Sequence, residues 1–311
     1  MTTFSVRLFG KFCAQRDEQV IDSLDMRKSK DLFCYLALNR DQPHARESVA
    51  GLLWGNTTTA QSKAYLRKAL WQLQEALHDP TAPAGQHILL VDSEWIQLNP
   101  KANLWLDIEV FEQAFNQAQG IAGHQISADC AQALRSAIDL YRGELLEGCY
   151  QDWCLYERER LQNIYLAILD KLMGYCEAQQ EYEHGLVYGA RILRYDRARE
   201  QTHRRLMRLH ALAGDRSAAL RQYEHCVAAL QDELNVAPTP YTIALFDQIR
   251  TNQLDGIPRS PLAHPASPTL DPPLTGILHN LKQLQNTVVD IQRQIQSTIH
   301  VIEKALLGQH K

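Results

Sequence analysis

The chain has 311 residues, of which 45% are hydrophobic and 22% are charged, and its formal net charge is −4 at pH 7. This length favours two or three domains, the composition is ordinary for a globular protein, and the charge gives no global signal for nucleic-acid binding. No apolar segment has the length or position of a signal peptide or a membrane span, so we expect a cytoplasmic protein with no membrane partner.

Seven cysteines are dispersed along the sequence, and the two closest to each other are Cys149 and Cys154. No histidine lies at ligand spacing beside this pair, whereas a zinc site normally uses two such pairs. The odd number also argues against a disulfide framework. We therefore expect buried free thiols, and neither a metal nor a cofactor.

The chain begins with short predicted strands. Phe4, Val6 and Leu8 alternate along one side of Thr3–Phe9, and strand-like pieces follow around 11–14 and 20–21. These pieces predict a small antiparallel sheet.

Two short helices are predicted next, over about 28–38 and 45–53. Apolar residues at helical spacing mark one buried side on each helix. In the second helix this side contains Val49, Leu52 and Leu53.

A longer helix is predicted over about 59–77, after threonines that can cap its N-terminus. One stripe of this helix is apolar and is expected to pack: Leu66, Leu70, Leu73 and Leu77. A hairpin of 88–91 and 95–98 follows. Strands, three helices and a hairpin in this order predict an OmpR-type winged helix-turn-helix over residues 1–100.

The remaining surface of the 59–77 helix carries Lys63, Arg67, Lys68, Trp71 and Gln72. In a winged helix this surface contacts bases and phosphates in the major groove; the alternative is the solvated face of a structural helix. Two positions are open to Trp71, against the second helix or beside the DNA backbone. Residues 1–98 contain eleven basic and eleven acidic residues, so DNA affinity must come from local clusters.

Other basic residues stand where helix-turn-helix domains approach phosphates. Arg27 and Lys28 precede the first helix and Arg46 opens the second, although solvation alone also accounts for them. Asp92 and Glu94 make the tip of the hairpin acidic, which argues against its entry into the minor groove. The candidate DNA-binding residues are Arg27, Lys28, Arg46, Thr59, Lys63, Arg67, Lys68, Trp71 and Gln72.

Several short motifs run through this region in a fixed order: Val6 to Gly10, Arg27-Lys28, Pro43 with Arg46-Glu47, Leu53-Trp54, and Leu66 to Leu70 with Leu73. Through them, residues 4–98 resemble the DNA-binding domain of the Streptomyces antibiotic regulatory protein (SARP) family. The resemblance implies side-by-side binding to direct repeats near a promoter, and recruitment of RNA polymerase through its sigma factor.

From about Leu104 the chain is predicted to be helical almost throughout, and two segments match at an offset of about 34 residues, with Gln180 on Gly214 and Glu181 on Asp215. That period predicts tetratricopeptide (TPR)-like helix pairs over residues 104–252. Ala211 to Asp215, Tyr223 and Pro238 to Pro240 make this part similar to the bacterial transcriptional activator domain of the same family.

Two features of this helical part have open interpretations. A basic region is either a docking surface for an acidic partner or a solvated rim; its members are Arg191, Arg194, Arg197, Arg199, Arg204, Arg205 and Arg208. Four aromatic residues line a ligand groove or belong to the core: Tyr175, Tyr182, Tyr188 and Tyr223.

Residues 253–274 are rich in proline and predict a linker. An amphipathic helix is predicted over 275–307, with apolar residues at spacings of four and three that are typical of a coiled coil. This helix either self-associates or folds back on the repeats, and we expect self-association. The candidate oligomerisation residues are Ile277, Leu281, Leu284, Val288, Ile291, Ile295 and Ile302.

The sequence thus predicts a mainly α-helical transcriptional activator that binds double-stranded promoter DNA, contacts RNA polymerase and forms a homo-oligomer. The alternative is a TPR scaffold or sensor whose groove binds a peptide or a small-molecule effector. No glycine loop for phosphate, nucleophile motif or metal-spaced histidine pair occurs, so we do not expect an enzyme.

Overall fold

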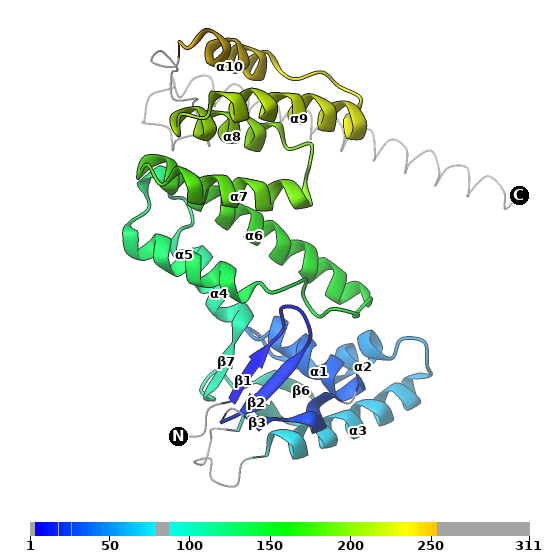
Figure 1. The fold of residues 1–311 in the computed structure, drawn as a ribbon. Coiled ribbons are helices and arrows are strands. Elements are labelled where there is room, and N and C mark those ends of the chain that lie inside the picture. The colour runs from blue at the N-terminus through cyan, green and yellow to red at the C-terminus, as the bar shows by residue number, and fades with distance from the viewer. Residues whose placement is uncertain (1–3, 18, 26, 79–86, 254–311) are drawn as a thin grey trace, which may run out of the picture. The chain divides into compact units, whose positions relative to one another are not determined.

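The computed structural model describes residues 4–17, 19–25, 27–78 and 87–253 (Figure 1). The predicted coiled-coil helix and nearly all of the predicted linker lie outside the described residues. Within this part of the chain, no helix is long and apolar enough to cross a membrane.

The predicted N-terminal sheet is confirmed, and it gains a fourth strand. β1 (Phe4–Arg7), β2 (Cys13–Arg16) and β3 (Gln19–Val20) are antiparallel, and β7 (Leu104–Leu106) pairs parallel to β1. The expectation that helical structure starts at Leu104 is therefore wrong. Residues 104–106 instead satisfy the backbone groups along the free edge of β1.

The three predicted helices are confirmed as α1 (Arg27–Leu38), α2 (Arg46–Leu53) and α3 (Thr59–Leu77), with a short 3-10 turn (Asp22–Asp25) before them. Val49 and Leu53 of α2 are buried as expected, but Leu52 is 46% exposed. The prediction for Leu52 was wrong because Ala50, rather than Leu52, completes the buried side of α2.

Helix α3 begins and packs as its sequence predicts. The Thr58 side chain accepts a hydrogen bond from the Gln61 backbone and the Gln61 side chain accepts one from the Thr58 backbone, which forms a capping box. The leucines of the apolar stripe, from Leu66 to Leu77, are all buried. One side of α3 is thus fixed in the domain core.

The hairpin after α3 is confirmed as β5 (Leu89–Val91) and β6 (Trp95–Leu98). A third strand, β4 (His44–Ala45), pairs with β6 just before α2 and was not predicted because two residues carry no periodic signal. The three strands form a second sheet in the order β4-β6-β5.

A buried carboxylate ties the N-terminal strands to the helical part. Asp107 opens α4 (Asp107–Gln117), and its side chain accepts hydrogen bonds from the backbone of Leu8 and Phe9 at 2.8 to 3.0 Å. The segment 144–147 then pairs with residues 8–10 through further backbone bonds, among them Leu146 N–H to the Leu8 carbonyl at 2.8 Å. Residues 8–10 are therefore hydrogen-bonded both to the first residue of α4 and to the segment 144–147 of the helical part.

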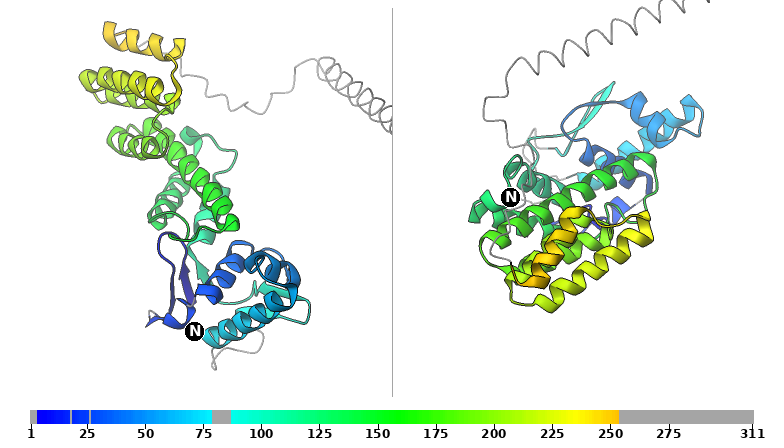
Figure 2. Two further views of the ribbon diagram at one scale, coloured as in Figure 1. Left: turned by 90° about the vertical axis from the view of Figure 1, so that its right-hand side faces the viewer. Right: turned by 90° about the horizontal axis from the view of Figure 1, so that it is seen from above.

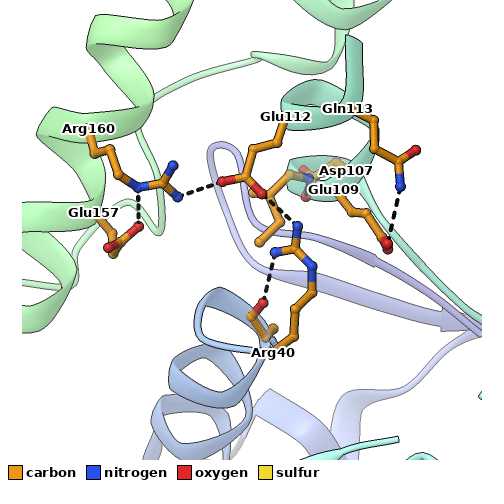
Figure 3. Close-up of polar contacts among 9 residues, drawn as sticks. Arg40, Asp107, Glu109, Glu112, Gln113, Glu157 and Arg160 are labelled. Atoms are coloured by element: carbon orange, nitrogen blue, oxygen red, sulfur yellow. Dashed lines mark hydrogen bonds and ion pairs between the residues drawn. The ribbon is translucent and has the colours of Figure 1, made fainter. Parts of the chain in front are cut away.

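A charged network adds to this connection (Figure 3). Glu112 of α4 accepts hydrogen bonds from Arg40, just after α1, and from Arg160, each at 2.6 Å. Arg160 also donates to Glu157 at 2.7 Å. Because the Glu112 side chain is only 15% exposed, these bonds are better shielded from water than ordinary surface ion pairs.

The remaining helices follow in antiparallel succession and stack in pairs (Figure 2). After α4, a 3-10 turn (Gly123–Gln125) precedes α5, and the bounds are α5 (Ala128–Leu140), α6 (Asp152–Ala178), α7 (Tyr182–Tyr195), α8 (Glu200–Leu212), α9 (Arg216–Leu234) and α10 (Pro240–Thr251). Helix α6 packs on α7 and α8 packs on α9.

The predicted repeat is visible in the backbone itself. Gln180 and Gly214 both have positive φ, at 62° and 84°. After them, Glu181 N–H bonds to the Cys176 carbonyl and Asp215 N–H bonds to the His210 carbonyl, at 2.8 and 2.9 Å. The α6–α7 and α8–α9 turns thus share one geometry, which confirms the TPR-like pairing.

Candidate nucleic-acid interface

The face of α3 opposite its leucine stripe is exposed to solvent. It carries Lys63, Arg67, Lys68 and Trp71, and it also contains Gln74, which the sequence analysis had not singled out. At 1.5 Å per residue α3 is about 28 Å long, which is enough to lie in a groove of DNA. The structure thus brings most of the candidate residues of α3 together on one face.

The basic side chains on this face differ in whether they form ion pairs within the protein. Lys63 pairs with Glu47 of α2, and this pair is exposed; the Lys63 ammonium lowers the pKa of Glu47 by hydrogen bonding and charge. Within the described residues, Arg67 and Lys68 form no ion pair. Their charges are the ones most available to an external anion.

Trp71 is 65% exposed, so its indole lies at the surface of α3 and not in the domain core. Trp54 at the end of α2 is buried instead, with its ring 6.5 Å from that of Tyr65. In the free protein the apolar indole ring of Trp71 therefore stays in contact with water, which is unfavourable for a large aromatic side chain. Of its two open positions, the structure places Trp71 on the outer face.

Gln72 lies differently from the other candidates on α3. It is half-buried, and its side-chain oxygen accepts a hydrogen bond from the Ser29 hydroxyl of α1 at 3.0 Å. Gln74 presents an exposed amide two residues later. The helical period does not separate these two glutamines, because Gln72 lies no closer to the leucine stripe than Gln74 does; the contact of Gln72 with Ser29 depends on how α1 packs against α3.

Arg46 is hydrogen-bonded to the turn of the β5–β6 hairpin. Its guanidinium donates to the Asp92 carbonyl at 2.7 Å, and its backbone N–H donates to the Glu94 carbonyl at 2.8 Å. The Asp92 carboxylate accepts the backbone N–H groups of Glu94 and Trp95, each at 2.7 Å, and these bonds lower its pKa. One of the two acids at the tip therefore shapes the turn.

Lys28 has partners inside the domain. Its ammonium donates to the Leu53 carbonyl at 3.3 Å, lies 3.6 Å from the Asp31 carboxylate and sits 5.7 Å from the Trp54 ring centroid. Thr59 opens α3 and is exposed. Arg27 opens α1, and its side chain lies outside the described part of the chain.

Four of the seven arginines in the basic region of the helical half form ion pairs within the chain: Arg197, Arg204, Arg205 and Arg208. Arg205 contacts Asp170 at 2.8 Å, Arg208 contacts Glu177 at 2.7 Å and Arg204 lies 3.7 Å from Glu200. These pairs neutralise the charges of the arginines that form them and so argue against a docking surface for an acidic partner; Arg205 is itself buried rather than part of a solvated rim.

The four aromatic residues of this half lie mostly in the interior. Tyr175 and Tyr188 are 9% and 7% exposed, so both belong to the core. Tyr223 stacks on Phe246 with ring centroids 4.2 Å apart, and Tyr182 packs partly buried against the core. These positions do not favour an aromatic ligand groove.

A polar pocket of about 440 Å³ lies at the charged network, lined by residues 38–42 together with Glu112, Glu157 and Arg160. Its arginines already bind Glu112, so they present little unpaired charge. Among the described residues, no three His, Cys, Asp or Glu side chains gather at a spacing that suits a metal ion.

Comparison with known proteins gives two findings. Residues 106–250 match the family model described as the bacterial transcriptional activator domain. The chain is also similar to the structure of Mycobacterium tuberculosis EmbR in complex with a low affinity phosphopeptide, with a TM-score of 0.61 and 18% sequence identity. That similarity covers 81% of this chain and 66% of the other, so this chain spans just under two thirds of the length of EmbR. No curated protein matches the chain.

Proposed function

We propose that this chain, which resembles the SARP family of bacterial transcriptional regulators, is a sequence-specific transcriptional activator that inserts α3 into the major groove of promoter DNA. The observation that carries the proposal is the two-sided character of α3. Its leucine side is buried in the core, and its other side exposes Lys63, Arg67, Lys68 and Trp71.

Each part of that face has a suitable chemical role. Arg67 and Lys68 supply hydrogen-bond donors for phosphates and for the acceptor edge of guanine, and Gln74 supplies an amide for adenine. Lys63 reaches a phosphate by exchanging its pair with Glu47, because a solvent-exposed ion pair of this kind contributes little to stability. Trp71 packs beside the sugar-phosphate backbone.

The helical part is proposed to contact RNA polymerase, through its sigma factor, and a second copy of the chain. The match of residues 106–250 to a transcriptional activator domain supports this role. A second bound copy makes the contact of each α3 effectively intramolecular, which compensates for a DNA-binding domain without net positive charge.

The experiment selects a cognate duplex from random DNA with the full chain and then measures affinity by fluorescence anisotropy over a range of salt concentrations. We expect the chain to prefer the selected duplex to a scrambled one. Arg67→Ala is expected to weaken cognate binding by about 1–3 kcal/mol if Arg67 reads a base, and Lys68→Ala to reduce the salt slope by about one if Lys68 binds a phosphate.

Arg221→Ala is the matched control, because Arg221 is an exposed arginine on α9, in the helical part. It should leave both affinity and salt slope unchanged. Equal binding to cognate and scrambled duplex by the unaltered chain would refute the proposed function. It would favour the alternative in which the repeats bind an effector, which would then raise the melting temperature of the chain.

A further inference from the structure

Strongly exposed apolar side chains gather at the start of helix α6. Tyr150, two residues before the helix, is 78% exposed, and Tyr156 in its second turn is 73% exposed. Leu155 beside it is 41% exposed. Single exposed apolar residues are ordinary on a protein surface, whereas neighbouring ones mark sites of interaction.

Two acidic residues share this face of α6. Asp152 and Glu159 lie one turn before and one turn after Leu155 and Tyr156, at the spacing that places all four along one side of a helix. Both acids are exposed, and neither forms an ion pair or a hydrogen bond with another described residue. We call this set the acidic aromatic patch: Tyr150, Asp152, Leu155, Tyr156 and Glu159.

The other side of these turns is fixed to the DNA-binding domain. The Gln151 amide donates to the Asp31 carboxylate of α1 at 2.9 Å, and the Trp153 indole N–H donates to the Gln151 side-chain oxygen at 2.7 Å. The Trp153 ring also lies 5.8 Å from that of Tyr35 on α1. The patch is therefore held directly beside the winged helix, and a rigid surface loses less conformational freedom when it binds.

The charge of the patch selects the kind of partner. Unpaired carboxylates repel phosphates, so the patch does not itself face the DNA backbone. A second protein on the same stretch of DNA neutralises phosphates with lysine and arginine and thus presents basic helices. Asp152 and Glu159 are complementary to such a surface, and complementary charge favours the correct partner.

We propose that the acidic aromatic patch is the docking site for a basic amphipathic helix of RNA polymerase. The inference rests on the proposed function, because a promoter-bound activator has the polymerase as its neighbour on the DNA. Leu155 and Tyr156 pack against the apolar side of the partner helix, as buried tyrosines do at the centres of many interfaces. Asp152 and Glu159 pair with the basic residues that flank that side.

The experiment titrates the fluorescently labelled full chain with purified RNA polymerase holoenzyme, without DNA, and follows anisotropy over a range of salt concentrations. Tyr156→Ala should weaken polymerase binding about tenfold or more, the effect of removing an aromatic residue on which an interface depends. Glu159→Lys should weaken binding and also reduce its salt dependence. Because both side chains are exposed and lie outside α3, neither change should lower the melting temperature or the affinity for the cognate duplex.

Two matched controls lie elsewhere in the helical part. Tyr241 on α10 is 80% exposed, and Glu224 is an exposed acid within α9. Tyr241→Ala and Glu224→Lys make the same chemical changes away from the patch. Both should leave polymerase binding unchanged, and a loss equal to that of the patch variants would overturn the proposal.

A photo-crosslinking amino acid in place of Tyr156 identifies the occupant. We expect it to link to a basic helix of a polymerase subunit. Linkage only to a second copy of the chain, or equal polymerase binding by Tyr156→Ala and the unaltered chain, would overturn the inference and leave the DNA-binding proposal intact. Polymerase binding that depends on Tyr156, in a chain that does not prefer the cognate duplex, would support the docking site and refute the DNA-binding proposal alone.

Discussion

At the scale of single residues, we expect removal of the Asp107 carboxylate to lower the free energy of unfolding markedly. Burial raises its pKa, while the backbone N–H groups of Phe9, Leu8 and Ile108 act to lower it. Asp107→Ala leaves buried N–H donors without acceptors, so we expect a loss of about 2–4 kcal/mol in the free energy of unfolding. Urea denaturation followed by circular dichroism measures this loss.

Glu109→Ala is the control for this substitution, because Glu109 lies on the same helix but is only half-buried. Its side chain accepts a single exposed hydrogen bond, from Gln113 at 3.3 Å. We expect a change within about 0.5 kcal/mol. Equal effects of the two substitutions would show that the Asp107 carboxylate does not connect β1 to α4 energetically.

At the scale of elements, α3 depends on its first turn. Thr58→Ala removes the capping oxygen and should lower the free energy of unfolding by about 1 kcal/mol. The first turn of α3 frays before the helix centre does, so binding to a cognate duplex should fall less than it does in Arg67→Ala. Thermal melts and the anisotropy assay measure the two effects.

Thr58→Ser retains an oxygen at the same position and should restore most of the stability. Failure of serine to do so would assign the loss to packing of the Thr58 methyl group rather than to the cap. Such a result would leave the proposed role of α3 unchanged.

At the scale of the whole molecule, the predicted helix over 275–307 should raise the oligomeric state. A chain that ends at residue 253 is expected to show a lower mass in light scattering than the full chain at equal concentration. Ile291→Asp, at a core position of the predicted coiled coil, should have the same effect as the truncation, because it places a charge in an apolar seam.

Asn286→Asp is the matched control, since residue 286 falls on the outer side of the same heptads. It should leave the mass unchanged. An identical mass for the full and the shortened chain would contradict self-association and would leave the alternative in which this helix folds back.

The local patterns of this sequence determine most of its elements. α3 runs over Thr59–Leu77 as its leucine spacing and its threonines predict, and the turn residues Gln180 and Gly214 mark a repeat that the backbone reproduces. Helical period, capping and turn conformation depend on neighbours close in sequence, so one sequence is enough to reveal them.

Only the tertiary structure decides which polar side chains and strands are bound to partners within the protein. It turns Gln72 toward Ser29, ties Lys28 to Leu53 and Asp31, and adds β7 to the sheet beside β1. It also joins Glu112 to Arg40 and Arg160. The partners in most of these contacts are distant in sequence, and no periodic pattern records which of them meet because the meeting depends on how the folded elements pack.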